Sequence, residues 1–223
     1  MPEQNCVLET YHDHYKDTVE LSKEARQRRN RSFILLCVLE AISFLLLRNP
    51  DMVLGILNES IQAKLETSIR FSNGILQTLV WTLIVYVLVR YIQDTVYVER
   101  QYGYLDSLEK KISALLGQEN LFKREGENYL NNYPAVLNLI DLFYKSFIPI
   151  LFTVINTVRI IMEWKSENGL FCSIVDSAVY VMVCILTIAY YFHIHKKTAG
   201  WFRRHFTWFQ RIDETIHKVL KEV

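Results

Sequence analysis

Residues 74–92 constrain the fold more than any other stretch, because they are 19 residues with one charge, Arg90, near the end. A helix needs about 20 mainly apolar residues to cross the roughly 30 Å hydrocarbon core of a bilayer, so this stretch is long enough to span. No proline or glycine follows before Gly103, where the sequence has become amphipathic. We expect one helix that leaves the bilayer and continues as a stalk.

Apolar residues occur in blocks along the whole chain, and the charges lie between them. Of 223 residues, 51% are hydrophobic and 22% are charged, while only 7 are glycine and 4 are proline. Few helix breakers favour long helices over a loop-rich or all-β fold. The sequence predicts an all-α integral membrane protein with four transmembrane helices and a cytosolic helical annex formed by helix extensions.

The blocks divide the chain into alternating membrane and aqueous segments. We predict four spans, at residues 33–47, 74–92, 143–164 and 170–195. Between them we expect an external amphipathic helix at 48–73, a cytosolic stalk with its connector at 93–142 and an external turn at 165–169. An N-terminal cytosolic helix at 1–32 and a cytosolic amphipathic tail at 196–223 complete the chain. Asn49-Pro50 is typical of a helix start and Gly117 of a helix end.

The basic residues predict the orientation. Outside the spans and their edges, the N-terminal segment, connector and tail hold 18 Lys and Arg, whereas the two opposite loops hold four. By the positive-inside rule both termini and the connector are expected in the cytoplasm. Arg31, Arg48 and Arg90 lie at span ends and are expected to extend to the membrane interfaces.

Polar residues inside the predicted spans are candidate functional residues, because charge at the bilayer centre costs on the order of 2.5–3.5 kcal/mol. Arg159 and Asp176 should lie at similar depth on adjacent antiparallel helices, which predicts an ion pair. The alternative is an ion or proton path, and Asn156, one turn from Arg159, could extend either arrangement. Glu40 has no obvious partner: it is either protonated and hydrogen-bonded within a bundle or between subunits, or ionised in a wet cavity.

The predicted stalk carries an apolar seam of roughly 3.5-residue spacing, formed by Val98, Leu105, Leu108, Ile112 and Leu115. Such a seam implies a partner surface. The partner-binding candidates along the stalk and connector are Tyr102, Leu105, Leu108, Lys110, Lys111, Lys123 and Arg124.

The tail mixes aromatic and basic residues, including Trp201, Arg203, Arg204 and Trp208. The inner membrane interface favours this mixture directly after a span. Protein packing is a second interpretation, and base stacking on nucleic acid is a less favoured third.

No sequence pattern indicates catalysis, a cofactor or a metal. Phosphate-binding glycine loops, nucleophile elbows and spaced carboxylate pairs are missing from the sequence. The pairs His12/His14 and His193/His195 have i, i+2 spacing, which points two side chains to nearly opposite faces of a helix. We therefore do not expect an enzyme.

Two segments, Tyr97–Ser113 and Phe122–Pro134, together with the four-span layout, resemble small bacterial inner-membrane proteins of phage-defence loci, best known as the membrane component of the Kiwa system. The resemblance implies a homo-oligomeric membrane sensor that holds a cytosolic partner and responds to envelope disturbance at infection. It assigns no site residue.

Two functions from different classes are consistent with these patterns. The first is a membrane anchor or sensor in which the second span moves its stalk against a cytosolic protein. The second is a pore-forming effector or small ion channel with Glu40 facing an oligomeric lumen. A secondary transporter is weaker, because the chain shows no internal repeat or pair of broken helices.

Overall fold

The computed structural model describes residues 2–65, 72–117, 135–165 and 170–194, and within these ranges the chain is helical without strands. The elements are α1 (Pro2–Arg48), α2 (Pro50–Leu65), α3 (Asn73–Leu115), α5 (Ala135–Leu142), the π-helix η1 (Phe143–Phe147), α6 (Ile148–Glu163) and α7 (Leu170–Ile194). Four helices, within α1, α3, η1–α6 and α7, are long and apolar enough to cross a membrane. The all-α, four-span prediction is confirmed.

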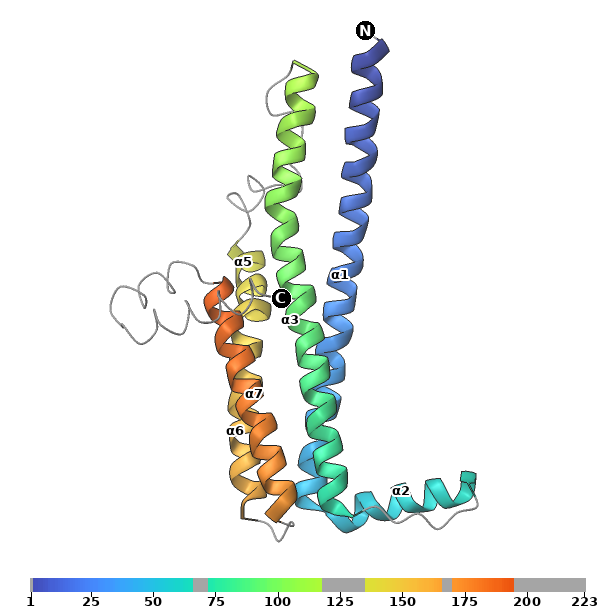
Figure 1. Ribbon diagram of the computed structural model, residues 1–223, viewed down its shortest axis with the longest axis vertical. Helices are drawn as coiled ribbons and strands as arrows, with labels where there is room; N and C mark the ends of the chain where they lie inside the picture. Colours follow the sequence, from blue (N-terminus) through green and yellow to red (C-terminus); the bar gives the residue numbers. More distant parts are fainter. Residues whose placement is uncertain (1, 66–71, 118–134, 166–169, 195–223) are drawn as a thin grey trace, which may run out of the picture.

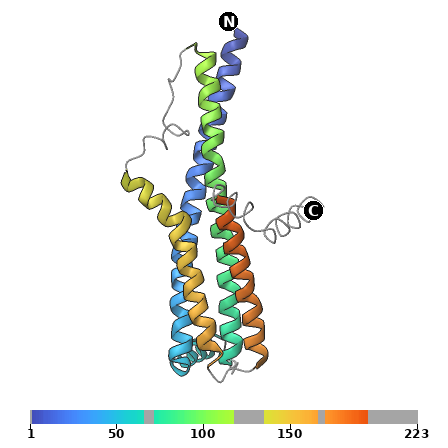
Figure 2. The ribbon, with the colours of Figure 1, turned by 90° about the vertical axis from the view of Figure 1, so that its left-hand side faces the viewer.

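The four long helices form a bundle, and α1 and α3 continue together beyond the ends of α6 and α7 (Figure 1). We call residues 6–28 of α1 and 94–115 of α3 the arm. Helix α2 projects sideways from the opposite end of the bundle, which we call the α2 end (Figure 1). The view turned by 90° shows α1 and α3 again side by side along the arm (Figure 2).

Helix α1 joins the predicted N-terminal helix to the first span without interruption. It covers 47 residues, because neither glycine nor a second proline occurs between Pro2 and its end at Arg48. Asn49 separates it from α2, which begins at Pro50 as its sequence predicts. Asn49 donates its N–H to the Leu45 carbonyl at 2.8 Å, which completes the end of α1.

Helix α3 begins one residue before the predicted position. The Ser72 hydroxyl accepts the Ile75 N–H at 3.4 Å as an N-cap. A Cβ at Gly74 would lie 3.0 Å from Cys172 Sγ, so the lack of a side chain lets α3 start close to α7. Gly117, with φ of 66°, ends α3 as predicted, since this conformation is open to glycine.

A buried apolar core lies between α1, α3, α6 and α7, mostly in the arm-side half of the bundle, and extends to Leu46 near the end of α1. Its largest fully buried members include Leu36, Ile84, Leu88, Ile148 and Tyr91. Large apolar side chains on the outward faces of the same helices are exposed, which suits contact with lipid tails. This division is expected of helices that pack with each other in a bilayer.

A π-helical turn introduces α6 where Pro149 removes a backbone donor. The Ile148 N–H donates to the Phe143 carbonyl, which is the wider i→i+5 pattern. The same pattern would give the Tyr144 carbonyl the N–H of Pro149, which proline lacks. The Tyr91 hydroxyl donates to that carbonyl at 2.7 Å and satisfies it from α3.

Candidate functional site: a buried polar cluster shared by the four spans

Helix α6 carries three polar side chains on one buried face. Asn156, Arg159 and Glu163 follow at i, i+3 and i+7, a spacing that places them above one another on one side of a helix. All three are almost completely buried in the bundle. The face they share therefore points at the other spans and not at lipid.

Glu40 of α1 has a partner across the bundle. Asn156 Nδ2 donates to Glu40 Oε1 at 2.6 Å and to the Phe152 carbonyl at 2.8 Å. Glu40 is only 5% exposed and lies inside the helical bundle. Its carboxyl group therefore points toward α6 of its own chain.

Arg159 is 0% exposed and lies against an indole ring. Its guanidinium carbon is 4.0 Å from the centre of the Trp81 ring, a cation–π contact. Its Nη2 also donates to the Gln77 carbonyl, at a long 3.4 Å. Trp81 Nε1 in turn donates to Glu163 Oε2 at 2.8 Å, so the indole connects α3 to both charged groups of α6.

The predicted Arg159–Asp176 ion pair is not formed. Asp176 is 1% exposed, and neither of its carboxylate oxygens has a hydrogen-bond partner; Arg159 Nε and Nη1 also have none. Arg159 and Asp176 nevertheless lie in the same buried region of the bundle, as their similar depth predicts, and they are close enough to interact electrostatically. The ring of Trp81 and the Gln77 carbonyl hold the guanidinium instead.

We call Glu40, Trp81, Asn156, Arg159, Glu163 and Asp176 the polar cluster. Each of α1, α3, α6 and α7 contributes to it. The cluster lies in the half of the bundle near α2. Glu163 is the last residue of α6, and Glu40 is about 12 Å from the end of α1, measured along the helix at 1.5 Å per residue. The apolar core closes it off from the arm.

Sequence reasoning missed Glu163 and Trp81. Glu163 lies beside Trp164 at the end of its span, where a charge is expected to extend into the headgroups. Tryptophan in a span is unremarkable by composition alone. The i, i+3, i+7 spacing of Asn156, Arg159 and Glu163 was the sequence signal that could have found this face.

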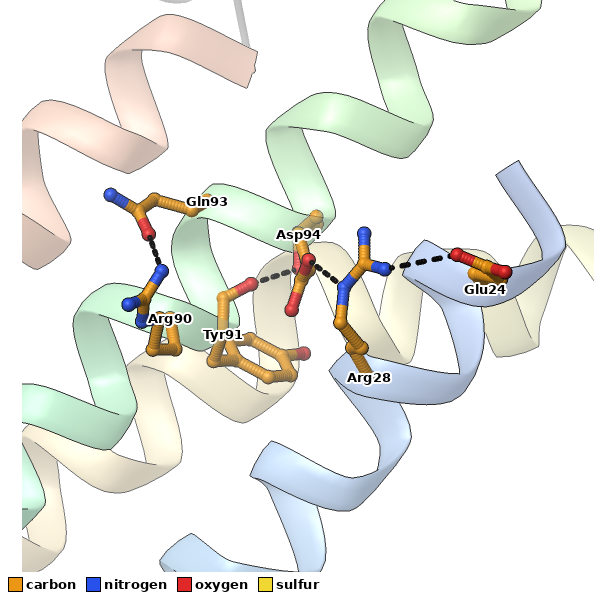
Figure 3. Close-up of polar contacts among 7 residues, drawn as sticks. Glu24, Arg28, Arg90, Tyr91, Gln93 and Asp94 are labelled. Carbon is orange, nitrogen blue, oxygen red and sulfur yellow. Dashed lines mark hydrogen bonds and ion pairs between the residues drawn. The ribbon is translucent and has the colours of Figure 1, made fainter. Parts of the chain in front are cut away.

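An ion pair also connects α1 and α3 where the bundle meets the arm (Figure 3). Arg28 Nε lies 3.2 Å from Asp94 Oδ1, and Arg28 Nη1 lies 3.5 Å from Glu24 Oε2. Arg90 is exposed, donates to Gln93 Oε1 at 3.5 Å and has its guanidinium 5.5 Å from the Tyr86 ring centre. Arg31 and Arg48 are exposed as well, as the interface prediction requires.

Four of the five residues of the apolar seam in the predicted stalk are buried within the chain, which corrects their assignment to an external partner, whereas Leu115 is exposed. Leu105 and Leu108 are buried where α3 lies beside α1. Tyr15 donates to Glu109 Oε1 at 3.0 Å in the same region. The sequence did not show that α1 extends far enough to cover this seam.

Some of the other partner-binding and membrane-interface candidates lie in the described ranges, and the rest do not. Lys110 and Lys111 are exposed on the arm, and Tyr102 is half-buried. The residues that fall outside the described ranges are Lys123, Arg124, Trp201, Arg203, Arg204 and Trp208.

Comparison with protein-family models, curated proteins and solved structures found no match to this chain.

Proposed function

We propose that the protein is a non-enzymatic membrane anchor and sensor that couples a change in the bilayer to a cytosolic protein partner. One observation carries the proposal: α1 and α3 run unbroken from the polar cluster to the arm, over 47 and 43 residues. Glu40 and Trp81 in the cluster thus share a backbone with Tyr15 and Glu109 in the arm.

Transmission follows from the stiffness of these two helices. A helix keeps its rise of about 1.5 Å per residue, so a change in tilt inside the bilayer displaces its far end. The Arg28–Asp94 pair fastens α1 to α3 at the junction, and Tyr15–Glu109 fastens them again in the arm. A bilayer condition that favours one of two helix packings would therefore move the arm as a unit.

The orientation and biological setting belong to the same proposal. The excess of Lys and Arg at both termini and in the connector supports an arm on the cytoplasmic side. The resemblance to phage-defence membrane proteins supports a bacterial inner membrane, a homo-oligomer and a role in antiviral defence. Lys110, which is paired with Asp106, and Lys111 are exposed on the arm and are candidate contacts for a cytosolic partner.

Interrupting the connection tests the mechanism. A flexible glycine segment inserted after Asp94 should uncouple the arm from the bundle, whereas the same segment after Ser60 in α2 should not. Spin labels at Lys111→Cys in the arm and at Lys165→Cys just after α6, with the four native cysteines replaced, report the separation of the arm from α6 in vesicles of increasing lipid chain length. We expect the distance to follow bilayer thickness in the uninterrupted chain and in the α2 control.

Two results would contradict the mechanism: a distance that is the same in all bilayers, or one that still follows thickness after the Asp94 insertion. Tags at the two termini test the orientation separately, and both should report the cytoplasmic side. Ion flux in liposomes that disappears with Glu40→Leu would favour the pore function instead.

A further inference from the structure

The polar cluster contains more acidic than basic groups. Glu40, Glu163 and Asp176 face a single guanidinium, that of Arg159, which acts electrostatically on all three. One positive charge neutralises one carboxylate, so two carboxylates would remain as uncompensated charges in a buried site. Such charges are very costly away from water, and a buried carboxylate without a counter-ion binds a proton instead.

Two of the three carboxyl groups, those of Glu163 and Asp176, interact with each other beside the guanidinium of Arg159. Glu163 also accepts the Trp81 N–H at 2.8 Å, and Glu40 accepts an N–H of Asn156 at 2.6 Å. Two neighbouring carboxyl groups beside one positive charge cannot both be ionised without a large cost, so Glu163 and Asp176 share one proton. Their remaining negative charge is balanced by Arg159, which leaves Glu40 without a counter-ion.

Asp176 faces no basic group besides Arg159, which Glu163 also faces. Helix α3 faces it only with neutral groups, chiefly Thr78, and α6 faces it with Glu163 and Arg159. Glu40 supplies the one carboxyl of α1 in the cluster, and α7 adds no charge besides Asp176 itself. Both Asp176 oxygens and Glu40 Oε2 are buried without hydrogen-bond partners.

We propose that the polar cluster is a proton-binding site that holds two protons at neutral pH, one on Glu40 and one shared by Asp176 and Glu163. Each site gains a proton as its carboxylate becomes a carboxylic acid, and the aqueous phase at the α2 end supplies that proton. The apolar core closes the arm side, so the site exchanges protons with one side of the membrane and does not conduct them across. Protons suit the site better than a metal ion, because the described residues contain no group of three His, Cys, Asp or Glu side chains that could hold one.

Infrared spectroscopy of the full chain in vesicles tests this directly, because a carboxylic acid and a carboxylate absorb separately. The unsubstituted protein at pH 7 should show a protonated-carboxyl band that shifts in heavy water. Asp176→Asn and Glu40→Gln should each remove part of that band, and the double variant should remove both parts. Asp51→Asn and Glu59→Gln, on the exposed residues of α2, are matched controls that should leave it unchanged.

A band that persists in the double variant, or one that is missing from the unsubstituted protein, would overturn the proposal. A band that appears only after sodium and potassium ions are removed would show that a cation occupies the cluster, which also overturns it. In vesicles of known orientation, raising the pH on the α2 side should weaken the band within the time of mixing, whereas an equally fast loss when the pH is raised on the arm side contradicts the one-sided access. The infrared bands report the protonation of carboxyl groups and not the position of the arm, so this test is separate from the test of the sensor function.

Discussion

Two arginines show how strongly position decides what a charge does in this protein. Arg159 is 0% exposed, in the polar cluster, and interacts with an indole ring and three carboxyl groups. Arg28 is at the junction of bundle and arm, where its side chain is 51% exposed and pairs with Asp94 and Glu24. An exposed ion pair thus positions two helices but contributes little to the free energy of unfolding, whereas a buried charge makes that free energy depend on the groups around it.

The largest effect is expected from Arg159→Leu. Removing the guanidinium leaves the carboxyl groups of the cluster without their counter-ion, and breaking a buried charge arrangement typically costs about 3–5 kcal/mol. The free energy of unfolding in mixed detergent micelles measures this. Arg48→Leu, the same substitution at an exposed arginine, is the control and should cost less than about 1 kcal/mol. Equal losses at the two positions would refute the comparison.

A second substitution sharpens the first. Adding Asp176→Asn to Arg159→Leu removes one of the stranded carboxyl groups, so the double variant should recover about 1–3 kcal/mol of the loss. The measurement is the same unfolding free energy, read as a double-mutant cycle. If the double variant is as unstable as the sum of the two single ones, the two residues are not electrostatically coupled.

Trp81→Phe should have an intermediate effect. Phenylalanine keeps an aromatic face toward Arg159 but loses the N–H that binds Glu163, and hydrogen bonds between membrane helices are worth roughly 0.6–1.7 kcal/mol. We expect a loss of stability of about that size in the micelle assay. Trp164→Phe, at an exposed tryptophan whose N–H binds Ser177, is the matched control and should lose less.

Tyr91→Phe tests the hydrogen bond from α3 to the π-helical turn, and it should lower the free energy of unfolding by roughly 1 kcal/mol. The substitution leaves the Tyr144 carbonyl without the hydroxyl that replaces the missing Pro149 N–H. Tyr86→Phe removes an exposed hydroxyl from the same helix and should be neutral. Faster amide hydrogen exchange around residues 143–149 in Tyr91→Phe alone would confirm the local cause.

The smallest effect is expected from Arg28→Ala. Exposed ion pairs contribute about 0–1 kcal/mol, so the unfolding free energy should hardly change. The distance between spin labels on α1 and α3 of the arm should nevertheless become more broadly distributed, because the pair with Asp94 positions these helices. If Arg28→Ala lowered the free energy of unfolding as much as Arg159→Leu does, the junction would contribute as much to stability as the polar cluster, against the expectation.

Local signals in the sequence determined most of the helix pattern. The predicted second span began at Gly74 where α3 begins at Asn73, the start of α2 at Pro50 was correct, and Gly117 ends α3 as expected. These features depend on caps, proline and hydrophobicity within a few residues. The π-helical turn was not predicted, because it depends on a hydroxyl supplied from α3.

Partners in space could not be predicted in the same way. Matching depths brought Arg159 and Asp176 together in one cluster but gave the wrong contact, since the Trp81 ring competes for the guanidinium. Glu40 had no partner in the sequence because Asn156 is 116 residues away. The seam around Leu105 and Leu108 was correctly identified as apolar, but its covering helix was assigned to another protein.

The sequence by itself determined that four apolar helices are long enough to cross a membrane, because hydrocarbon thickness and backbone hydrogen bonding set the length and type of a span. Only the tertiary structure decided that polar residues of all four helices meet in one half of the bundle and that α1 covers the seam of α3. Helix length is a property of consecutive residues, whereas these contacts depend on how each helix is rotated about its axis when the bundle packs.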